Sequence, residues 1–167
     1  MATDILRQEL VNDGAGRLFY RGARYLLVRP ETLAALQRAV EAELGARAPE
    51  PLAAGGRVGG GAAARALGGA PRALVERLLG MGGEIGWGEF SLERLSAVEL
   101  VVTVRHSPFA EAYGRAEGPV CHLTRGVLDG LARLVLLGPL PVVETACAAA
   151  GAPLCRFEAR VPGEAPR

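Results

Sequence analysis

The stretch of sequence that decides the fold is PVCHLTRGVLDGLARLVLLGPLPVVETACAAAGAPLCRFEARV, residues 119–161. It contains all three cysteines of the chain, Cys121, Cys147 and Cys155, and the carboxylate of Glu144 lies between the first two. Three thiolates and one carboxylate oxygen suit the tetrahedral coordination of a structural zinc ion. Spacing alone leaves one alternative open, because free cysteines are also among the most common small hydrophobic core residues.

Two local structures are expected within this segment. A helix is predicted from about Cys121 to Leu137, because apolar residues recur along it every three or four positions. A hairpin is predicted from strands at 141–147 and 154–161, with its turn near Gly151. The hairpin brings the cysteines of its two strands together, and the helix N-terminus favours a thiolate at Cys121.

The spacing within the first strand of this hairpin departs from a regular strand. Glu144 and Cys147 are separated by three positions, so on a regular strand their side chains would face opposite sides. A bulge or an early turn is therefore expected between them. His122, next to Cys121, is an alternative fourth ligand, although a histidine at the surface start of a helix is the favoured interpretation.

The N-terminal half of the chain predicts a hairpin and a helix, followed by a segment of low information. Short aromatic and β-branched runs at 16–20 and 24–28 predict the hairpin, and a helix is expected over 30–45. Residues 46–70 could form a Gly/Ala-rich helix or a flexible connection. The run 59–64 only loosely resembles a dinucleotide-binding motif, because no strand precedes it.

The middle of the chain predicts one helix and one strand. The helix begins at Pro71 and is expected to end at the glycines of 80–83. A β-branched run at 98–105 predicts the strand, which Pro108 closely follows. Residues 109–118 are polar and are expected to be irregular.

Composition excludes several classes of function. The 167 residues suit a single domain over 1–167, with 1–15 as an N-terminal extension and 162–167 as a tail. The net charge of +1 supplies no general attraction for nucleic acid. No run approaches the roughly 18 apolar residues of a membrane span, and the N-terminus does not resemble a signal peptide. The odd number of cysteines argues against a disulfide framework, so a cytoplasmic location is expected.

The segment that opened this section resembles the C-terminal pattern of the 4-vinyl reductase domain family. That pattern has a cysteine at a helix start, glycines within the helix, a Glu-x-x-Cys, a glycine turn and a Cys-x-Phe. Here these positions are Cys121, Gly126, Gly130, Glu144, Cys147, Gly151, Cys155 and Phe157. The resemblance extends over about 16–161 and is specific from about residue 98 onward.

The resemblance implies a fold, a metal site and a mode of assembly. In phenol-sensing regulators of this family the matching residues bind zinc, which implies a structural zinc held by Cys121, Glu144, Cys147 and Cys155. The implied fold is α+β, with helices packed on a twisted antiparallel sheet around an apolar pocket, similar to small subunits of vesicle-tethering (TRAPP) complexes. Family members often dimerise, so a homodimer is expected.

Four residues are candidates for lining the pocket, namely Trp87, Phe90, His106 and Phe109. For the aromatic residues the alternative is ordinary core packing, and for His106 it is a histidine that caps the loop after a strand. The phenol-sensing regulators also carry an ATPase and a DNA-binding domain, which this sequence lacks. They have a pocket tryptophan where Pro108 stands here, so phenol recognition is not carried over.

Three functions follow from the resemblance. The first is a stand-alone sensor or carrier module that binds a small hydrophobic or aromatic molecule, with a tetrapyrrole among the candidates, and holds a structural zinc. The second is an accessory protein or reductase of bacteriochlorophyll-type tetrapyrrole biosynthesis. The third is a dimeric interaction scaffold. No nucleophilic triad is present in the sequence, so a non-enzymatic role is favoured.

Overall fold

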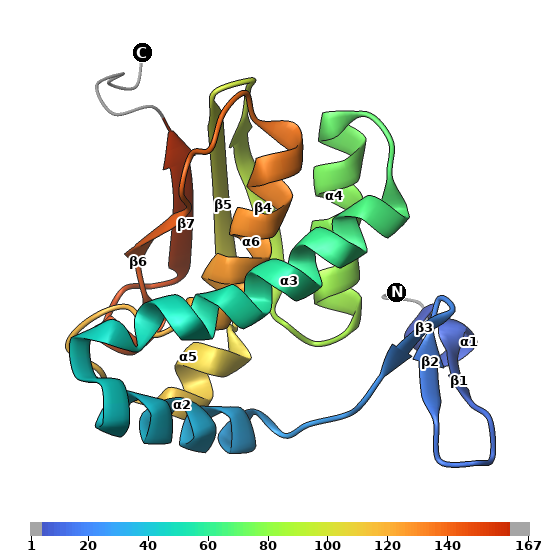
Figure 1. The fold of residues 1–167 in the computed structure, drawn as a ribbon, viewed down its shortest axis with the longest axis horizontal. Helices are drawn as coiled ribbons and strands as arrows, with labels where there is room; N and C mark the ends of the chain where they lie inside the picture. The colour runs from blue at the N-terminus through green and yellow to red at the C-terminus, as the bar shows by residue number, and fades with distance from the viewer. Residues whose placement is uncertain (1–4, 161–167) are drawn as a thin grey trace.

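The computed structural model describes residues 5–160, which form two antiparallel sheets and a set of helices (Figure 1). The helices are α1 (Ile5–Glu9), α2 (Pro30–Leu44), α3 (Pro49–Leu67), α4 (Pro71–Glu84), α5 (Pro108–Tyr113) and α6 (His122–Val135), with short 3-10 turns η1 (Gly45–Arg47) and η2 (Ala148–Ala150). The strands are β1 (Leu10–Asn12), β2 (Leu18–Tyr20), β3 (Ala23–Tyr25), β4 (Glu89–Leu95), β5 (Glu99–Arg105), β6 (Val143–Ala146) and β7 (Cys155–Arg160). The predicted α+β class with antiparallel sheets and helices is confirmed.

The main sheet has the strand order β4-β5-β7-β6, and every neighbouring pair is antiparallel. Its central strand β5 is buried on both faces from Leu100 to Val104, as its run of β-branched residues predicts. One face packs on α4 and α6, and α3 crosses over α6 on the side away from the sheet (Figure 1). The opposite face carries polar pairs, such as Thr103 donating to Glu93 at 3.0 Å.

Helices α3 and α6 cross with almost no side chains between their backbones. A Cβ placed on Gly126 would lie 1.9 Å from the carbonyl oxygen of Ala53, and one on Gly56 would lie 2.2 Å from that of Leu123. These distances are far below contact, so glycine is required at both positions. The glycines of α6 therefore allow the close backbone approach that their spacing predicts, and the partner is the Gly/Ala-rich segment.

Residues 5–25 form a small unit that projects from the rest of the molecule and joins it through an extended linker (Figure 1). Its strands β1, β2 and β3 make an antiparallel meander. The hydroxyl of Tyr20, a residue only 1% exposed, donates to the Glu84 carboxylate at the end of α4. In the linker, Leu26 and Leu27 are 72% and 81% exposed.

The structure corrects several expectations about local structure. Residues 49–67 form a continuous helix, which decides between the two options for the Gly/Ala-rich segment. Helix α4 does not end at the glycines of 80–83 but continues to Glu84. Residues 108–113, expected to be mostly irregular, form the short helix α5, which Ser107 caps by accepting from the Ala110 N–H. None of the helices among residues 5–160 is long and apolar enough to cross a membrane.

Candidate metal centre and apolar cavity

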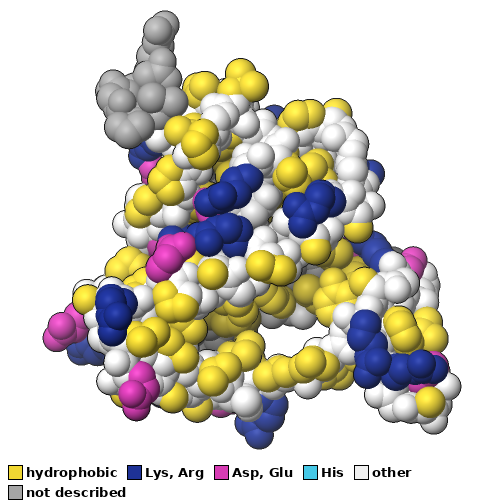
Figure 2. Space-filling view, in the orientation of Figure 1, with side chains coloured by type: hydrophobic (Ala, Val, Ile, Leu, Met, Phe, Trp, Pro, Cys, Tyr) yellow, Lys and Arg dark blue, Asp and Glu magenta, His cyan; other side chains and the backbone are white. Residues whose placement is uncertain are grey.

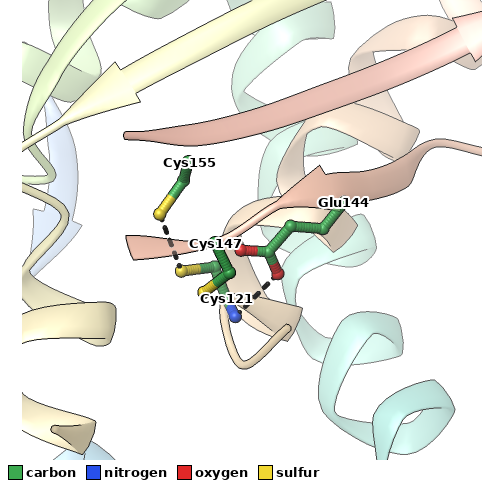
Figure 3. Close-up of side chains that lie close together, drawn as sticks. All are labelled: Cys121, Glu144, Cys147 and Cys155. Carbon is green, nitrogen blue, oxygen red and sulfur yellow. Dashed lines mark hydrogen bonds between the residues drawn. The ribbon is translucent and has the colours of Figure 1, made fainter. Parts of the chain in front are cut away.

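The predicted metal ligands come together at one corner of the main sheet (Figure 3). Cys121 immediately precedes α6, Glu144 lies in β6, Cys147 follows that strand, and Cys155 begins β7. All four side chains are buried, and their candidate ligand atoms lie within 4.8 Å of one another. Residues separated by up to 34 positions thus form one compact group of three sulfur atoms and a carboxylate.

The conflict over the spacing of Glu144 and Cys147 is resolved by an irregular strand end. The register of β6 against β7 shifts between Glu144 and Ala146, and Cys147 lies beyond the last strand residue. The chain then turns through η2 and through Gly151, whose φ of +93° favours glycine. The predicted bulge or early turn is therefore present, and it brings both side chains to the same side.

The distances within this group fit a tetrahedral metal ion. The Sγ atoms of Cys121 and Cys155 are 3.6 Å apart, and a tetrahedral zinc with bonds of about 2.3 Å to sulfur would hold two sulfur atoms about 3.8 Å apart. The Oε2 atom of Glu144 accepts from the Cys121 N–H at 2.9 Å. Its Oε1 atom is buried and has no hydrogen-bond partner, which is the condition expected of an oxygen that awaits a cation.

The ionisation of these groups shows how strongly they interact. Burial, followed by the interaction with Cys147, raises the pKa of Glu144 to about 8. Hydrogen bonding to Cys147 and to Cys155 raises the pKa of the Cys121 thiol, whereas the same contacts lower the pKa of Cys147. The buried group therefore concentrates negative charge on a few atoms and holds protons on the others, and a divalent cation is the natural replacement for those protons.

Two neighbours of the cluster differ from the sequence interpretation. His122 is only 8% exposed, rather than lying at the surface, and burial lowers the pKa of its imidazole. It is not one of the four grouped residues. Ser107 was not anticipated, and its Oγ lies 3.4 Å from the Cys121 Sγ. The Ser-Pro pair at 107–108 is a helix-start signal that could have identified this capping residue.

A separate apolar cavity of about 650 Å³ lies between α3, α4 and the N-terminal sheet. Figure 2 shows the hollow between that sheet and the rest of the molecule, with mainly hydrophobic side chains in its walls. The lining residues are Ala23, Arg24, Tyr25, Gly55, Gly56, Gly59, Gly60, Ala62, Ala63, Ala66, Leu78, Leu79, Met81, Gly82, Ile85, Trp87, Phe90, Leu123, Val127 and Leu128. Arg24 and Tyr25, both on β3, are the only lining residues with polar side-chain atoms besides the Trp87 indole.

The structure places the four predicted pocket residues differently. Trp87 and Phe90 line the cavity. Phe109 packs edge-on against Trp87, with ring centroids 4.9 Å apart, and does not itself line the cavity. His106 is not among the lining residues. Strand β5 ends just before it, its φ is +54°, and its exposed side chain lies 3.7 Å from the Glu111 carboxylate.

The sequence interpretation also missed one whole wall of the cavity. Small residues of α3 form this wall, among them Gly55, Gly59 and Ala62, and β3 adds Tyr25. Burial raises the pKa of the Tyr25 hydroxyl. The spacing of the α3 residues by three and four positions is the signal that could have identified one helix face.

Comparison with known proteins places this geometry in a family context. Residues 100–161 match the family model of the 4-vinyl reductase domain, so the resemblance to this family is confirmed for the segment that holds the cysteine cluster. None of the curated proteins compared with the chain matches it.

Two solved structures share the fold. The crystal structure of the phenol-responsive sensory domain of the transcription activator PoxR with phenol is 19% identical, with a TM-score of 0.81 over 93% of this chain and 86% of that chain. A vinyl-4-reductase family protein from Methanocaldococcus jannaschii is 16% identical, with a TM-score of 0.52 over 84% of both chains. At these identities the likeness shows the fold alone.

Proposed function

We propose that this protein is a sensor or carrier module that binds an apolar small molecule in the cavity beside α3 and is held together by a structural zinc. The cavity is the observation that carries the proposal. Its volume of about 650 Å³ lies within the range of about 300–1,000 Å³ that is usual for ligand sites. Its lining is almost entirely apolar, so the favourable term for a ligand is the removal of apolar surface from water.

The similarity to the sensory domain of PoxR supports this proposal at the level of fold. The side chains around the cavity support it at the level of chemistry, because Trp87 and Phe90 offer ring surfaces against which an aromatic ligand can pack. A tetrapyrrole is the second candidate ligand for the same reason. An absorbance titration with a porphyrin tests it, and an unperturbed spectrum would remove tetrapyrroles from consideration.

The zinc is proposed as a structural ion held by Cys121, Glu144, Cys147 and Cys155. When bound, it would cross-link the start of α6 to the β6–β7 hairpin. A set of four protein ligands leaves no open position for a substrate, unlike the sites of zinc enzymes. The chemistry of ligand recognition is therefore assigned to the cavity.

A homodimer is proposed as the working assembly. The support is the apolar linker between the N-terminal sheet and α2, where Leu26 and Leu27 are largely exposed in a single chain. Exposed neighbouring leucines of this kind are a typical feature of surfaces that become covered by a partner.

A thermal titration tests ligand binding. With naphthalene at about 100 times its Kd, linkage predicts about 2.7 kcal/mol of added stability, which is about 5–10 °C for a chain of this length. Because Trp87 is the only tryptophan, its fluorescence should change in the same titration. Glucose serves as a hydrophilic control and should change neither signal. If a series of apolar aromatics left both signals unchanged, the proposed function would be wrong.

A further inference from the structure

Helix α3 has two stripes of small residues, and close packing explains only one of them. The first stripe faces α6, where a Cβ on Gly56 would lie 2.2 Å from the Leu123 carbonyl oxygen and one on Gly60 would lie 2.4 Å from that of Val127. At these positions any side chain would force the helices apart. Glycine is therefore required at both for structural reasons alone.

The second stripe contains Gly55 and Gly59, one helical turn apart, and both line the cavity. A Cβ placed on either would meet nothing within 4 Å. Neither residue is among the glycines with positive φ. Glycine within a helix costs about 1 kcal/mol relative to alanine, so these two residues lower helix stability without any packing contact that requires them. What they leave is open space in the cavity.

The amount of space shows what kind of ligand would use it. A cavity of about 150 Å³ is sufficient to hold benzene, and this cavity is about 650 Å³. A ligand with one ring would leave most of the apolar lining without contacts, which forfeits dispersion energy. The other walls are bulky, with Leu78, Met81, Trp87 and Phe90 among the lining residues, so the additional room lies along the α3 backbone.

We infer that the cavity accepts a multi-ring apolar molecule, and that Gly55 and Gly59 determine the upper limit of its size by leaving the α3 backbone bare. This inference rests on the proposed function, because it concerns the same cavity. It adds the class of ligand and two residues that determine specificity.

The test compares pyrene, with four fused rings, and toluene, with one, on the wild-type protein and on Gly59→Leu. The wild type should bind pyrene more tightly than toluene. In the variant the leucine side chain would occupy the cavity, so pyrene binding should weaken by at least about tenfold. Toluene binding should change by less than about threefold, because the remaining space still exceeds that of one ring.

Gly80 supplies a matched control. It lies within α4, a Cβ on it would also meet nothing within 4 Å, and it does not line the cavity. Gly80→Leu should therefore change helix stability in the same direction as Gly59→Leu while leaving the affinities for both probes unchanged. Gly55→Leu and the smaller Gly59→Ala keep the test available if Gly59→Leu does not fold.

The outcomes separate the inference from the proposed function. Tighter wild-type binding of toluene than of pyrene, or unchanged pyrene binding in Gly59→Leu, would overturn the size inference while the proposed function stands. Equal loss of pyrene binding in Gly80→Leu would also overturn it, because the effect would then arise from the helix substitution. Absence of binding by either probe to the wild type would overturn the proposed function and this inference with it.

Discussion

The two oxygens of the Glu144 carboxylate are in different situations. One accepts a backbone hydrogen bond from Cys121, and the other is buried without a partner. A buried acceptor left without a partner costs about 1–3 kcal/mol. The sequence placed this residue with the cysteines only through a family resemblance, because a carboxylate three positions from a cysteine has no meaning until the strand irregularity is known.

Zinc content tests the assignment of the four ligands. Purified protein should contain one zinc per chain by elemental analysis, and Cys147→Ser should lose it together with a large part of its thermal stability. Glu144→Gln should weaken retention against a chelator by at least about tenfold, which is the loss expected even when only a partner of a ligand is removed.

His122→Asn is the control for that experiment, since His122 is adjacent to Cys121 and outside the cluster. The variant should retain its zinc. A metal-free wild type that is fully folded would contradict the assignment, and so would zinc loss in His122→Asn with retention in Glu144→Gln.

Among the elements, the predictable ones were those whose patterns are strong locally. The apolar stripe of α6 and the β-branched run of β5 identified both correctly. Helix α3 was left undecided because five glycines within 19 residues make an isolated helix unfavourable. Contacts with α6 stabilise it, and those contacts are absent from any local pattern. The same limit applies to the cavity, which exists only where distant elements meet.

Adjacent glycines of α3 should respond to alanine with opposite signs. Gly56→Ala places a methyl group against the Leu123 carbonyl and should cost about 1–3 kcal/mol of unfolding free energy. Gly55→Ala meets no neighbour and should add about 0.5–1 kcal/mol. Urea denaturation of the two variants measures both values. Equal effects at the two positions would contradict the packing described for α3 and α6.

A buried carboxylate also joins these two helices. Asp129 of α6 accepts from Arg57 of α3 and, at 3.2 Å, from Arg133. Burial alone would raise the pKa of Asp129, but the hydrogen bonds from Arg57 and from the Val142 N–H outweigh it and hold the pKa below its ordinary value of 3.8.

Asp129→Asn should therefore lower the unfolding free energy by about 1–3 kcal/mol near neutral pH. Since the pKa is lower in the folded state, the contribution of the carboxylate is complete above the ordinary value and disappears as the pH falls through the folded value. Wild type and variant should thus become similar in stability only in strong acid. A difference that stays constant to the lowest pH at which the protein folds would contradict this explanation.

At the scale of the whole molecule, the N-terminal sheet and the linker are the features with most surface still uncovered. The predicted hairpin is confirmed, but its second strand ends at Tyr25, so the apolar residues that follow belong to the linker. Composition could not distinguish apolar residues of a strand from apolar residues of an exposed linker, because the difference depends on which surface the segment meets.

Chymotrypsin cleavage in the linker tests the proposed homodimer. Leu26 and Leu27 should be cut readily in dilute protein and should become protected as the concentration rises, with a matching increase in sedimentation coefficient. Replacing both leucines with serine should abolish the concentration dependence and leave a monomer, because the association loses its apolar contact. Wild-type protein that sediments as a monomer at every concentration would refute the dimer.

The wall that β3 contributes to the cavity has a thermodynamic consequence. Arg24 and Tyr25 belong to a unit that is joined to the rest of the chain by an extended linker, whereas the other cavity walls belong to the main body. A ligand that contacts both parts favours the arrangement in which they are docked. By reciprocity, a change that favours docking, such as the hydrogen bond from Tyr20 to Glu84, increases affinity for that ligand by the same free energy. Occupancy of the cavity is thereby converted into the position of the N-terminal sheet.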